Sequence, residues 1–357
     1  MQNTKKLQLL FLPKYTAAGA SSRYRMYQYL PFLENENCSC VISPLFSDEY
    51  IKQFNNGAKL NFIKLFLAYL QRFFVLFSVR KYDLIIIQYE LFPYIPFKIE
   101  YWLKKMGINY LIDFDDAVFH NYDSLKPKFI IPWYKSKFDK AIENANWVVT
   151  GSPYLTTFCE QYSNKVVEIP TVVNLRNYPL VETENSEFII GWIGSKSTSK
   201  YIVDILPALK EFSQHHQCKV HLIGFDKQIN IEEKLPNAIL IEWNSNTEAE
   251  EISKFTVGIM PLVDNNWENG KCGFKLIQYM ACGKPTISTP LLANKKIDRN
   301  ETALFADTQQ QWVEALNQVL SNEHKYKNIG IENRKIIASE YSITANFPKL
   351  LKLIKNT

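Results

Sequence analysis

A turn bracketed by glycines and followed by a lysine is the segment whose residue types point most directly to chemistry. Residues 267–290 have the sequence WENGKCGFKLIQYMACGKPTISTP, in which Gly270 and Gly273 flank the turn and Phe274–Ala281 is predicted to be a helix. Such a turn presents free backbone N–H groups at the positive end of the helix dipole, and Lys275 adds a full charge. The arrangement suits a diphosphate, although a plain loop–helix–strand connection explains the segment equally well when it is taken alone.

A second candidate phosphate site follows the apolar run 188–193. Gly194 and Ser195 come directly after that run, and Lys200 lies six residues beyond Gly194. We predict that Lys200 contacts phosphate, and a solvated lysine at the start of a helix is the alternative. The segment GWIGSKS is not a P-loop, because that motif needs glycine directly before its lysine and Ser195 stands there instead.

The first third of the chain contains two kinds of candidate ligand-binding group, an exposed stretch of backbone and an arginine. Gly19 and Ala20 lie among small residues at a predicted strand–helix turn, where the main chain is open to a ligand. Arg23 lies just inside the helix that follows and is suited to bind a phosphate or another anionic group. An ordinary surface arginine is the alternative interpretation.

Acidic residues gather at the end of the predicted strand 109–114. Asp113, Asp115 and Asp116 lie there, and His120 follows shortly after. Neighbouring carboxylates of this kind can bind sugar hydroxyls, orient an acceptor or raise one another's pKa. Capping of the loop is the alternative for Asp113, and a surface position is the alternative for His120.

No metal site is predicted. A cluster of metal-binding residue types runs into the strand that begins near residue 219, where neighbouring side chains point to opposite faces. Its members are His215, His216, Cys218 and His221.

The elements that position these residues repeat one pattern. Short apolar runs at 7–12, 82–89, 109–114 and 146–152 alternate with helical segments, and the opening strand, small-residue loop and helix return at 188–212. This predicts an α/β fold with two Rossmann-like, doubly wound domains facing a central cleft that binds ligands. We place the first domain at 1–175, the second at 176–335, and an amphipathic helical tail at 336–357 that packs back on the first domain.

Composition excludes several classes of protein. The 357 residues are 46% hydrophobic and 22% charged with a net charge of +5, which indicates a globular protein and no nucleic-acid partner. The six cysteines form no C-x-x-C pair, and no signal peptide is apparent at the first residues. We therefore expect a cytoplasmic protein without disulfides.

Residues 59–79 form an almost wholly apolar stretch with Arg72 near its middle. Burying that charge in a bilayer would cost about 3 kcal/mol, so a transmembrane helix is not predicted. Two interpretations stay open: a helix packed in the core of the first domain, or one whose aromatic face lies in a membrane surface. Residues 51–110 hold nine cations and three carboxylates, which suits peripheral contact with an anionic membrane at the inner face, beside a lipid-linked acceptor.

Taken together, these motifs resemble the retaining GT-B glycosyltransferases of family four, the glycosyl transferases of group 1. Met280, Ala281, Cys282, Gly283 and Pro285 match the end of the family's donor-binding signature. The segments AAGASSRYR, DFDDAVF, GWIGS and RNETALFADTQQQWVEAL resemble further family motifs along nearly the whole chain. The two acidic positions of the signature fall on Gly270 and Gln278, and Glu268 lies two residues before the first of them.

The resemblance implies transfer of a sugar from a nucleotide-sugar donor to a saccharide or lipid-linked acceptor, with retention, no metal and no cofactor, in cell-surface polysaccharide or glycoconjugate biosynthesis. A catalytically silent nucleotide-sugar-binding or scaffold protein and a nucleotide-sugar 2-epimerase are the alternatives. The implied catalytic residues are Asp116, His120 and Lys200, and Asp113, Asp115 and Asp116 would contact the acceptor. The implied donor-binding residues are Gly19, Ala20, Arg23, Gly194, Ser195, Lys200, Gly273, Phe274, Lys275 and, at the ribose, Gln278.

Overall fold

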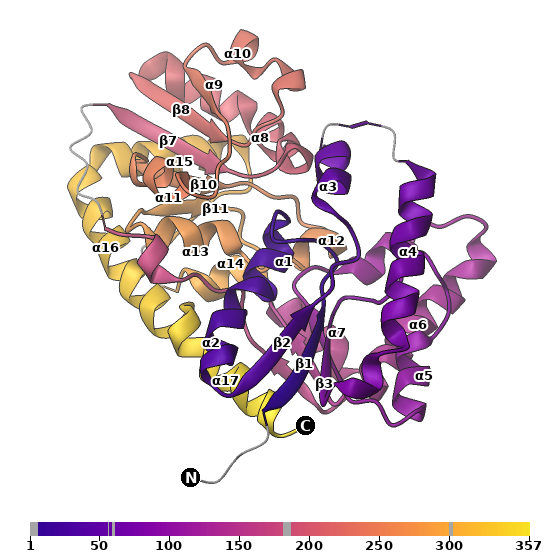
Figure 1. The fold of residues 1–357 in the computed structure, drawn as a ribbon. Helices are drawn as coiled ribbons and strands as arrows, with labels where there is room; N and C mark the ends of the chain where they lie inside the picture. Colours follow the sequence, from indigo (N-terminus) through magenta and orange to yellow (C-terminus); the bar gives the residue numbers. More distant parts are fainter. Residues whose placement is uncertain (1–5, 56, 59–60, 181–186, 300–302) are drawn as a thin grey trace. The chain divides into compact units, whose positions relative to one another are not determined.

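The computed structural model describes residues 6–55, 57–58, 61–180, 187–299 and 303–357, which form two compact units (Figure 1). The first unit comprises Met1–Thr171, Gly270–Cys272 and Asn346–Thr357, and the second comprises Val172–Asn269 and Gly273–Ala345. This division differs from the predicted domain limits in three places, the first of which is that residues 172–175 lie in the second unit. Residues 336–345 stay with the second unit because helix α16 runs unbroken over Glu323–Glu340, and three residues of the glycine-bracketed turn belong to the first unit.

The first unit is built on a six-stranded parallel sheet with the strand order β2-β1-β3-β4-β5-β6. Four of its strands lie within the predicted apolar runs, whereas the edge strand β2 has a mixed sequence, CSCVI, that gave no apolar signal. The strands are β1 (Leu7–Leu12), β2 (Cys38–Ile42), β3 (Leu84–Gln88), β4 (Tyr110–Phe114), β5 (Trp147–Thr150) and β6 (Val166–Glu168).

Helices flank this sheet (Figure 1). The last of them, α17, packs its C-terminal part on α2, where the rings of Phe347 and Phe32 lie 5.5 Å apart and Lys355 pairs with Glu36 at 2.9 Å. The helices are α1 (Ala20–Arg25), α2 (Leu30–Asn35), α3 (Asp48–Asn55), α4 (Phe62–Leu76), α5 (Ile99–Lys105), α6 (Ile131–Asn144), α7 (Pro153–Glu160) and α17 (Ile343–Lys355).

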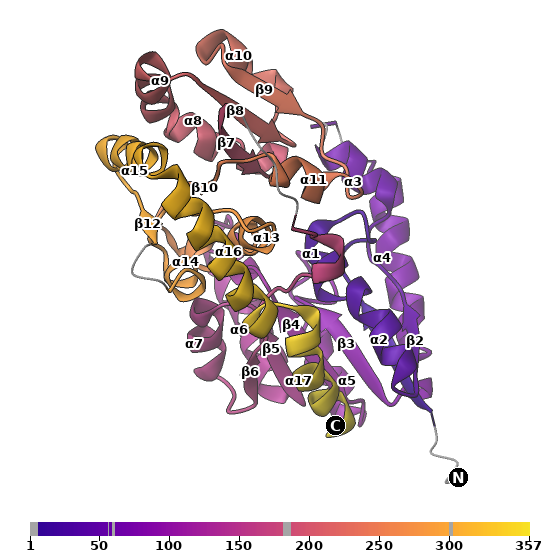
Figure 2. The same ribbon diagram turned by 90° about the vertical axis from the view of Figure 1, so that its left-hand side faces the viewer.

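The second unit repeats the architecture with a six-stranded parallel sheet in the order β12-β11-β10-β7-β8-β9 (Figure 2). The prediction of two doubly wound α/β domains is therefore confirmed, and the cleft stays a prediction. The strands are β7 (Phe188–Ile193), β8 (Cys218–Ile223), β9 (Ala238–Ile241), β10 (Val257–Met260), β11 (Thr286–Ser288) and β12 (Leu304–Phe305). The helices are α8 (Lys200–Asp204), α9 (Leu206–His215), α10 (Ile231–Lys234), α11 (Glu248–Ser253), α12 (Asn266–Asn269), α13 (Phe274–Ala281), α14 (Leu292–Ile297), α15 (Gln309–Ser321) and α16.

Glycines in two central strands let aromatic rings pack against the sheet. A side chain at Gly191 of β7 would overlap the ring of Phe255, and one at Gly258 of β10 would overlap the ring of Tyr279. The hydroxyl of Tyr279 accepts a hydrogen bond from the Ile193 amide at 3.0 Å and donates one to the Ile259 carbonyl at 3.1 Å. These contacts fix α13 on the ends of β7 and β10.

Helix α4 is reversed with respect to the usual pattern of burial. Arg72 is its one buried residue, and its guanidinium donates to the carbonyls of Pro13 and Ser43, each at 2.9 Å. The phenylalanines of the helix are exposed. Among the described residues, no helix combines the length and the apolar character that crossing a bilayer would require.

A buried ion pair joins α1 to the sheet of the first unit. Arg25 donates to both carboxylate oxygens of Asp113 on β4 and also, at 2.8 Å, to the carbonyl of Ile169. Both side chains of the pair are almost fully buried. The pair holds the C-terminal end of α1 against the carboxyl end of β4.

Arg25→Met should lower the free energy of unfolding by about 3–5 kcal/mol, because Asp113 would be left as an uncompensated buried charge. The matched control is Arg299→Met, which removes an exposed pair with Glu340 at 2.7 Å and should cost at most about 1 kcal/mol. Urea unfolding of both variants measures the difference. Equal losses in the two variants would contradict the assignment of a structural role to the buried pair.

Candidate active site

The carboxyl end of β4 carries the acidic cluster that the sequence indicated, and its three aspartates differ in their surroundings. Asp113 is buried and both of its oxygens accept from Arg25. Asp115 is also buried, whereas Asp116 is partly exposed. The cluster therefore offers one carboxylate to solvent at Asp116, while Asp113 holds α1 in place.

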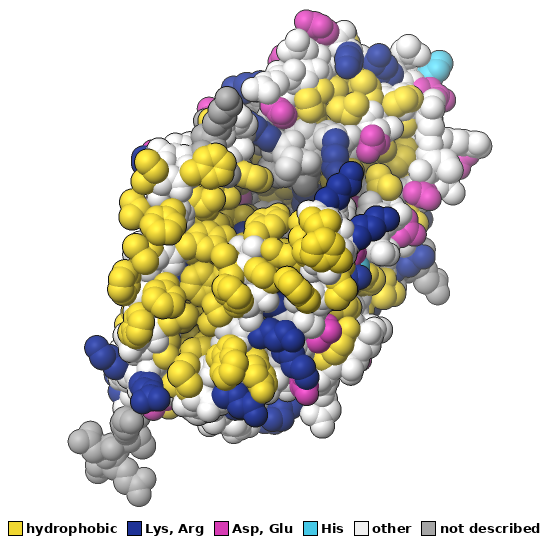
Figure 3. Space-filling model, turned by 90° about the vertical axis from the view of Figure 1, so that its right-hand side faces the viewer, with side chains coloured by type: hydrophobic (Ala, Val, Ile, Leu, Met, Phe, Trp, Pro, Cys, Tyr) yellow, Lys and Arg dark blue, Asp and Glu magenta, His cyan; other side chains and the backbone are white. Residues whose placement is uncertain are grey.

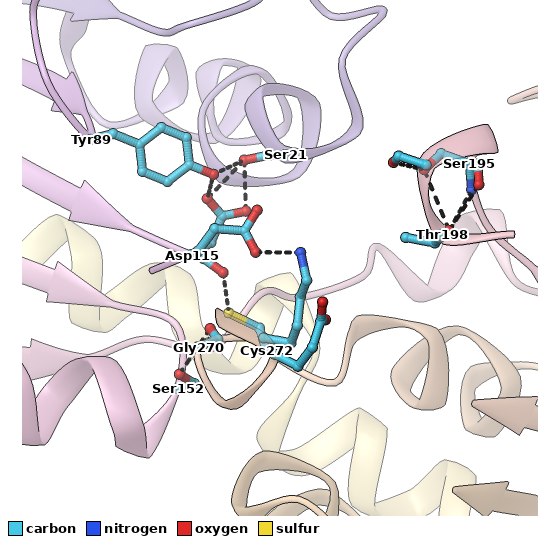
Figure 4. Close-up of polar contacts among 12 residues, drawn as sticks. Ser21, Tyr89, Asp115, Ser152, Ser195, Thr198, Gly270 and Cys272 are labelled. Carbon is cyan, nitrogen blue, oxygen red and sulfur yellow. Dashed lines mark hydrogen bonds and ion pairs between the residues drawn. The ribbon is translucent and has the colours of Figure 1, made fainter. Parts of the chain in front are cut away.

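Asp115 lies in a small hydrogen-bonded network (Figure 4). Ser21, in the first turn of α1, donates to its two oxygens at 2.8 and 2.6 Å, and the Tyr89 hydroxyl after β3 donates to the same carboxylate. Burial, followed by the charge of Asp116, raises the pKa of Asp115 to about 6. A carboxyl group with that pKa exchanges its proton near neutral pH, which suits hydrogen bonding to a sugar hydroxyl in either protonation state.

The glycine-bracketed turn contributes to this cluster from a distant part of the chain (Figure 4). Lys271 pairs with Asp116 at 2.9 Å, and the Cys272 thiol donates to the Asp115 carbonyl at 2.9 Å. The Ser152 hydroxyl donates to the Gly270 carbonyl at 3.3 Å. A side chain at position 270 would come within 2.5 Å of the Cβ of Ala117, so this packing has no room for the acidic residue found in the family signature.

Each ring nitrogen of His120 has a hydrogen-bonding partner. Its Nδ1 lies 2.5 Å from the carboxylate of Asp123, and its Nε2 lies 2.7 Å from the hydroxyl of Tyr154. The ring also lies close to Phe119, on the same short helical turn. Both ring nitrogens therefore have partners, and a catalytic role for His120 would require one of these hydrogen bonds to be exchanged for one to substrate.

The turn before α1 is compact. Gly19 is the residue before the helix, and a side chain there would approach the Cβ of Tyr15 to 2.7 Å. Ala20 is exposed at the first helical position. Arg23 donates to the carbonyl of Ala17 at 3.1 Å and lies over the ring of Tyr24 at 4.9 Å. Through its hydrogen bond to Ala17, Arg23 stabilises the loop whose backbone was predicted to face the donor.

In the second unit, the turn after β7 and the start of α13 both lie against the ring of Trp192. The Lys275 ammonium lies 5.7 Å from the centre of the Trp192 ring, and a side chain at Gly194 would overlap that same ring. Gly273 precedes α13 in the left-handed conformation, with φ of 64°, which favours glycine. The structure therefore brings together the predicted donor residues Gly194, Gly273, Phe274 and Lys275.

The turn that leads to Lys200 is stabilised by its own side chains. Ser195 and Thr198 form a capping box, in which the Ser195 amide donates to the Thr198 hydroxyl at 3.0 Å. Lys200 is exposed at the first position of α8, with its ammonium 4.8 Å from the centre of the Tyr201 ring. The neighbouring hydroxyl of Tyr201 donates to the buried carboxylate of Glu268 on α12. This bond connects the turn before α8 to the segment that leads into α13.

Gln278 is buried in a polar cluster that the sequence did not indicate. Its amide nitrogen donates to the Tyr178 hydroxyl at 3.1 Å and to Glu248 at 3.4 Å. Glu248 is buried as well, and it accepts from Tyr178 at 2.7 Å and from the Trp243 indole at 2.8 Å. A carboxylate therefore lies beside position 278 although residue 278 itself is uncharged.

Several residues of these clusters escaped prediction for identifiable reasons. Tyr89 follows β3 at the same sheet edge as Asp115, so the general rule about the carboxyl ends of parallel strands would have found it. Ser21 and Lys271 have no distinctive local signal. Glu248 begins a helix in a polar segment, which looks like a solvated surface in the sequence. Among the described residues, no group of three or more His, Cys, Asp or Glu is arranged to hold a metal ion.

Comparison with known proteins identifies a family match in the second unit. Residues 187–322, which include β7, Lys200 and α13, match the family model described as "Glycosyl transferases group 1". The resemblance to this family is confirmed. No curated protein matches the sequence at a significant level.

Solved structures show the same GT-B fold over the whole chain. A glycosyltransferase from Rickettsia africae is 13% identical with a TM-score of 0.71, and 98% of each chain is covered. Sucrose-phosphate synthase from Thermosynechococcus elongatus is 14% identical with a TM-score of 0.70, also over 98% of each chain. HepE from Anabaena, in complex with UDP-glucose, is 11% identical with a TM-score of 0.72 and covers 98% of this chain and 100% of its own.

Asp115→Asn should alter the pH dependence of stability. The pKa of Asp115 is about 6 in the folded protein against 3.8 for an ordinary aspartate, so the folded state holds this proton more tightly. This contribution is fully present below about pH 4 and is lost as the pH rises through about 6, by at most about 3 kcal/mol. In urea unfolding from about pH 4 to about pH 7, the wild type should therefore lose stability relative to the variant. A difference that stays constant over that range would contradict the network around Asp115.

Gln278→Glu should lower the free energy of unfolding by about 1–3 kcal/mol, since a second buried carboxylate would face Glu248 and one hydrogen-bond donor would be lost. The double variant Gln278→Glu with Glu248→Gln restores one carboxylate and one amide, and it should recover most of that loss. Chemical denaturation of the single and double variants completes the cycle. A double variant no more stable than Gln278→Glu would count against the direct contact.

Proposed function

We propose that this protein is a glycosyltransferase that moves a sugar from a nucleotide-sugar donor to an acceptor hydroxyl with retention of anomeric configuration. The observation that carries the proposal is the match of residues 187–322 to the group 1 glycosyl transferases. This segment contains the turn after β7 and the start of α13, and both lie against the ring of Trp192. A UDP-sugar is the first donor to test, because the HepE structure contains UDP-glucose.

The donor diphosphate is proposed to bind the second unit. The backbone amides at the start of α13 lie at the positive end of the helix dipole, and Lys275 is held beside them over Trp192. Lys200, with Ser195 and Gly194 in the preceding turn, supplies a second cation. Gln278 is proposed to contact the ribose, with its side chain oriented by the bonds of its amide nitrogen to Tyr178 and Glu248.

These groups act on the leaving nucleotide. As the bond between the anomeric carbon and the phosphate oxygen breaks, negative charge grows on the diphosphate, and fixed cations and amides stabilise that charge. The acceptor oxygen forms the new bond to the anomeric carbon on the same face. A phosphate oxygen of the leaving nucleotide takes the acceptor proton, so the step requires no strong base from the protein and no metal or cofactor is invoked.

The acceptor is proposed to bind the first unit. Asp116, which is partly exposed and pairs with Lys271, is proposed to accept hydrogen bonds from acceptor hydroxyls. Asp115 is proposed to contact the acceptor as well, by exchanging a hydrogen bond that it now accepts from Ser21 or Tyr89. Gly19 directly precedes α1, Ala20 and Arg23 lie within that helix, and His120 lies on the turn after Asp116. Asp113 takes part through Arg25, which fixes the end of β4.

The cellular setting follows from the chemistry of such donors. Nucleotide sugars are cytoplasmic metabolites, so a cytoplasmic enzyme, acting at the inner face of the membrane on a lipid-linked acceptor, is proposed. Synthesis of a cell-surface polysaccharide or glycoconjugate is the process in which we place it.

Lys200→Ala and Lys275→Ala should each lower turnover by about a hundredfold or more, because each removes a cation from the developing diphosphate charge. The matched control is Lys325→Ala on α16, whose ammonium likewise lies over the ring of the next residue, Tyr326, at 5.5 Å. The measurement is release of nucleotide from UDP-, GDP- and ADP-sugars, with and without saccharide acceptors.

Two outcomes would count against the proposal. Activity within a few-fold of wild type in both variants would remove the phosphate site from α13 and α8. Tight binding of a nucleotide sugar without hydrolysis or transfer to any acceptor would favour the silent binding protein, for which the uncharged Gln278 is the supporting observation.

A further inference from the structure

An exposed apolar surface covers one side of the first unit (Figure 3). On α4 and the residue that follows it, this surface consists of Phe62, Phe66, Phe73, Phe74 and Phe77, whose side chains are 48% to 81% exposed. At about 3.6 residues per turn, these five positions fall within about a third of the helix circumference, so they share one side. We call this surface, together with the neighbouring residues named next, the aromatic face.

Two further elements extend the aromatic face. Phe97 and Trp102 lie before and within α5, and Phe129 and Trp133 lie before and within α6, with 60% to 71% of each side chain exposed. Packing holds the elements together: the Tyr69 hydroxyl of α4 donates to the Pro93 carbonyl at 2.7 Å, and α5 packs on α6. A patch of this many large apolar side chains indicates a partner surface, because isolated exposed apolar residues are the norm in soluble proteins.

The orientation of α4 shows that this exposure is built into the fold. The arginine of the helix points inward and is bonded to two carbonyls, while its phenylalanines point outward. Hydropathy alone would turn the helix the other way, with the rings in the core. The two carbonyl bonds of Arg72, together with the bond of Tyr69 to Pro93, hold the outward orientation.

Four exposed cations lie in segments adjoining those that carry the aromatic face. Arg80 and Lys81 follow α4, and Lys126 and Lys128 precede α6; all four are exposed, and none of them pairs with a carboxylate of the residues that the structure describes. The exposed carboxylates Glu49, Asp123 and Glu143 each already have a lysine partner. Asp48, next to Glu49, accepts from the Thr16 hydroxyl and has no cation partner among the described residues. The four unpaired cations outnumber it, so the net unpaired charge of these segments is positive.

We propose that the aromatic face is a docking surface for an anionic lipid bilayer, into whose interfacial region the phenylalanines and tryptophans insert while the cations meet lipid phosphates. Aromatic side chains beside lysine and arginine are the composition that suits this region. A second copy of the chain fits less well, since a symmetric contact would place the same unpaired cations against one another. A lipid-linked acceptor on the docked membrane is a further step that rests on the proposed function.

The test is flotation of the full-length protein with vesicles of phosphatidylcholine alone or mixed with phosphatidylglycerol, without any donor. Binding should need the anionic lipid and weaken as the ionic strength rises. The triple variant Phe66→Gln, Phe74→Gln, Phe77→Gln should lower the vesicle partition coefficient by about tenfold or more. The control, Ile239→Gln with Ile331→Gln, changes exposed apolar residues of the second unit and should bind as wild type does.

The charge contribution is measured separately. Lys126→Gln with Lys128→Gln should weaken binding to the anionic vesicles and leave nucleotide release on a soluble acceptor unchanged. Thermal unfolding of every variant checks that the fold is retained, which we expect because the altered side chains are exposed.

Three results would overturn the inference: no binding of wild type to anionic vesicles, binding that the triple variant leaves unchanged, or a wild-type dimer in light scattering that the triple variant dissociates. The last result would assign the face to self-association. None of these readouts uses sugar transfer, so failure of the docking surface and failure of the proposed activity are distinguishable.

Discussion

The packing of the Tyr279 ring on Gly258 fixes the geometry of the second unit's site. Because position 258 has no side chain, the ring lies flat against β10 and its hydroxyl reaches backbone groups of both β7 and β10. Helix α13 is thereby set at the ends of these two strands, and Lys275 comes to lie over Trp192. A fully buried ring thus determines where the ammonium of Lys275 and the start of α13 lie.

The first unit reaches a comparable result with ionic groups. Arg25 donates to both carboxylate oxygens of Asp113. The other two aspartates, Asp115 and Asp116, interact instead with hydroxyl groups and with Lys271 at the edge of the sheet. Ser21, on the helix that Arg25 anchors, reaches Asp115 only because that helix is held against β4. Three adjacent carboxylates therefore separate into one that fixes the backbone, one with a raised pKa and one that faces solvent.

Local signals in the sequence predicted the elements well. The strand Leu7–Leu12 and the helix Phe274–Ala281 have the predicted limits, because an unbroken apolar run and a pair of flanking glycines mark them. Strand β2 was missed because an edge strand with Cys and Ser lacks an apolar run. The orientation of α4 was also unpredictable, since periodicity identifies a stripe on a helix but not which side packs inward when an arginine finds two carbonyl partners.

The two departures from the family signature are explained by contacts with residues far away in the sequence. Gly270 is required because Ala117 lies where its side chain would be, and Ala117 belongs to the acidic segment whose carboxylate pairs with the next residue, Lys271. Gln278 faces Glu248, so a glutamate at 278 would bring two buried carboxylates together. In each case a negative charge lies close by, on Asp116 or on Glu248, and comes from a different segment of the chain. A comparison of the motif position by position cannot detect these carboxylates, because they come from segments far away in the sequence.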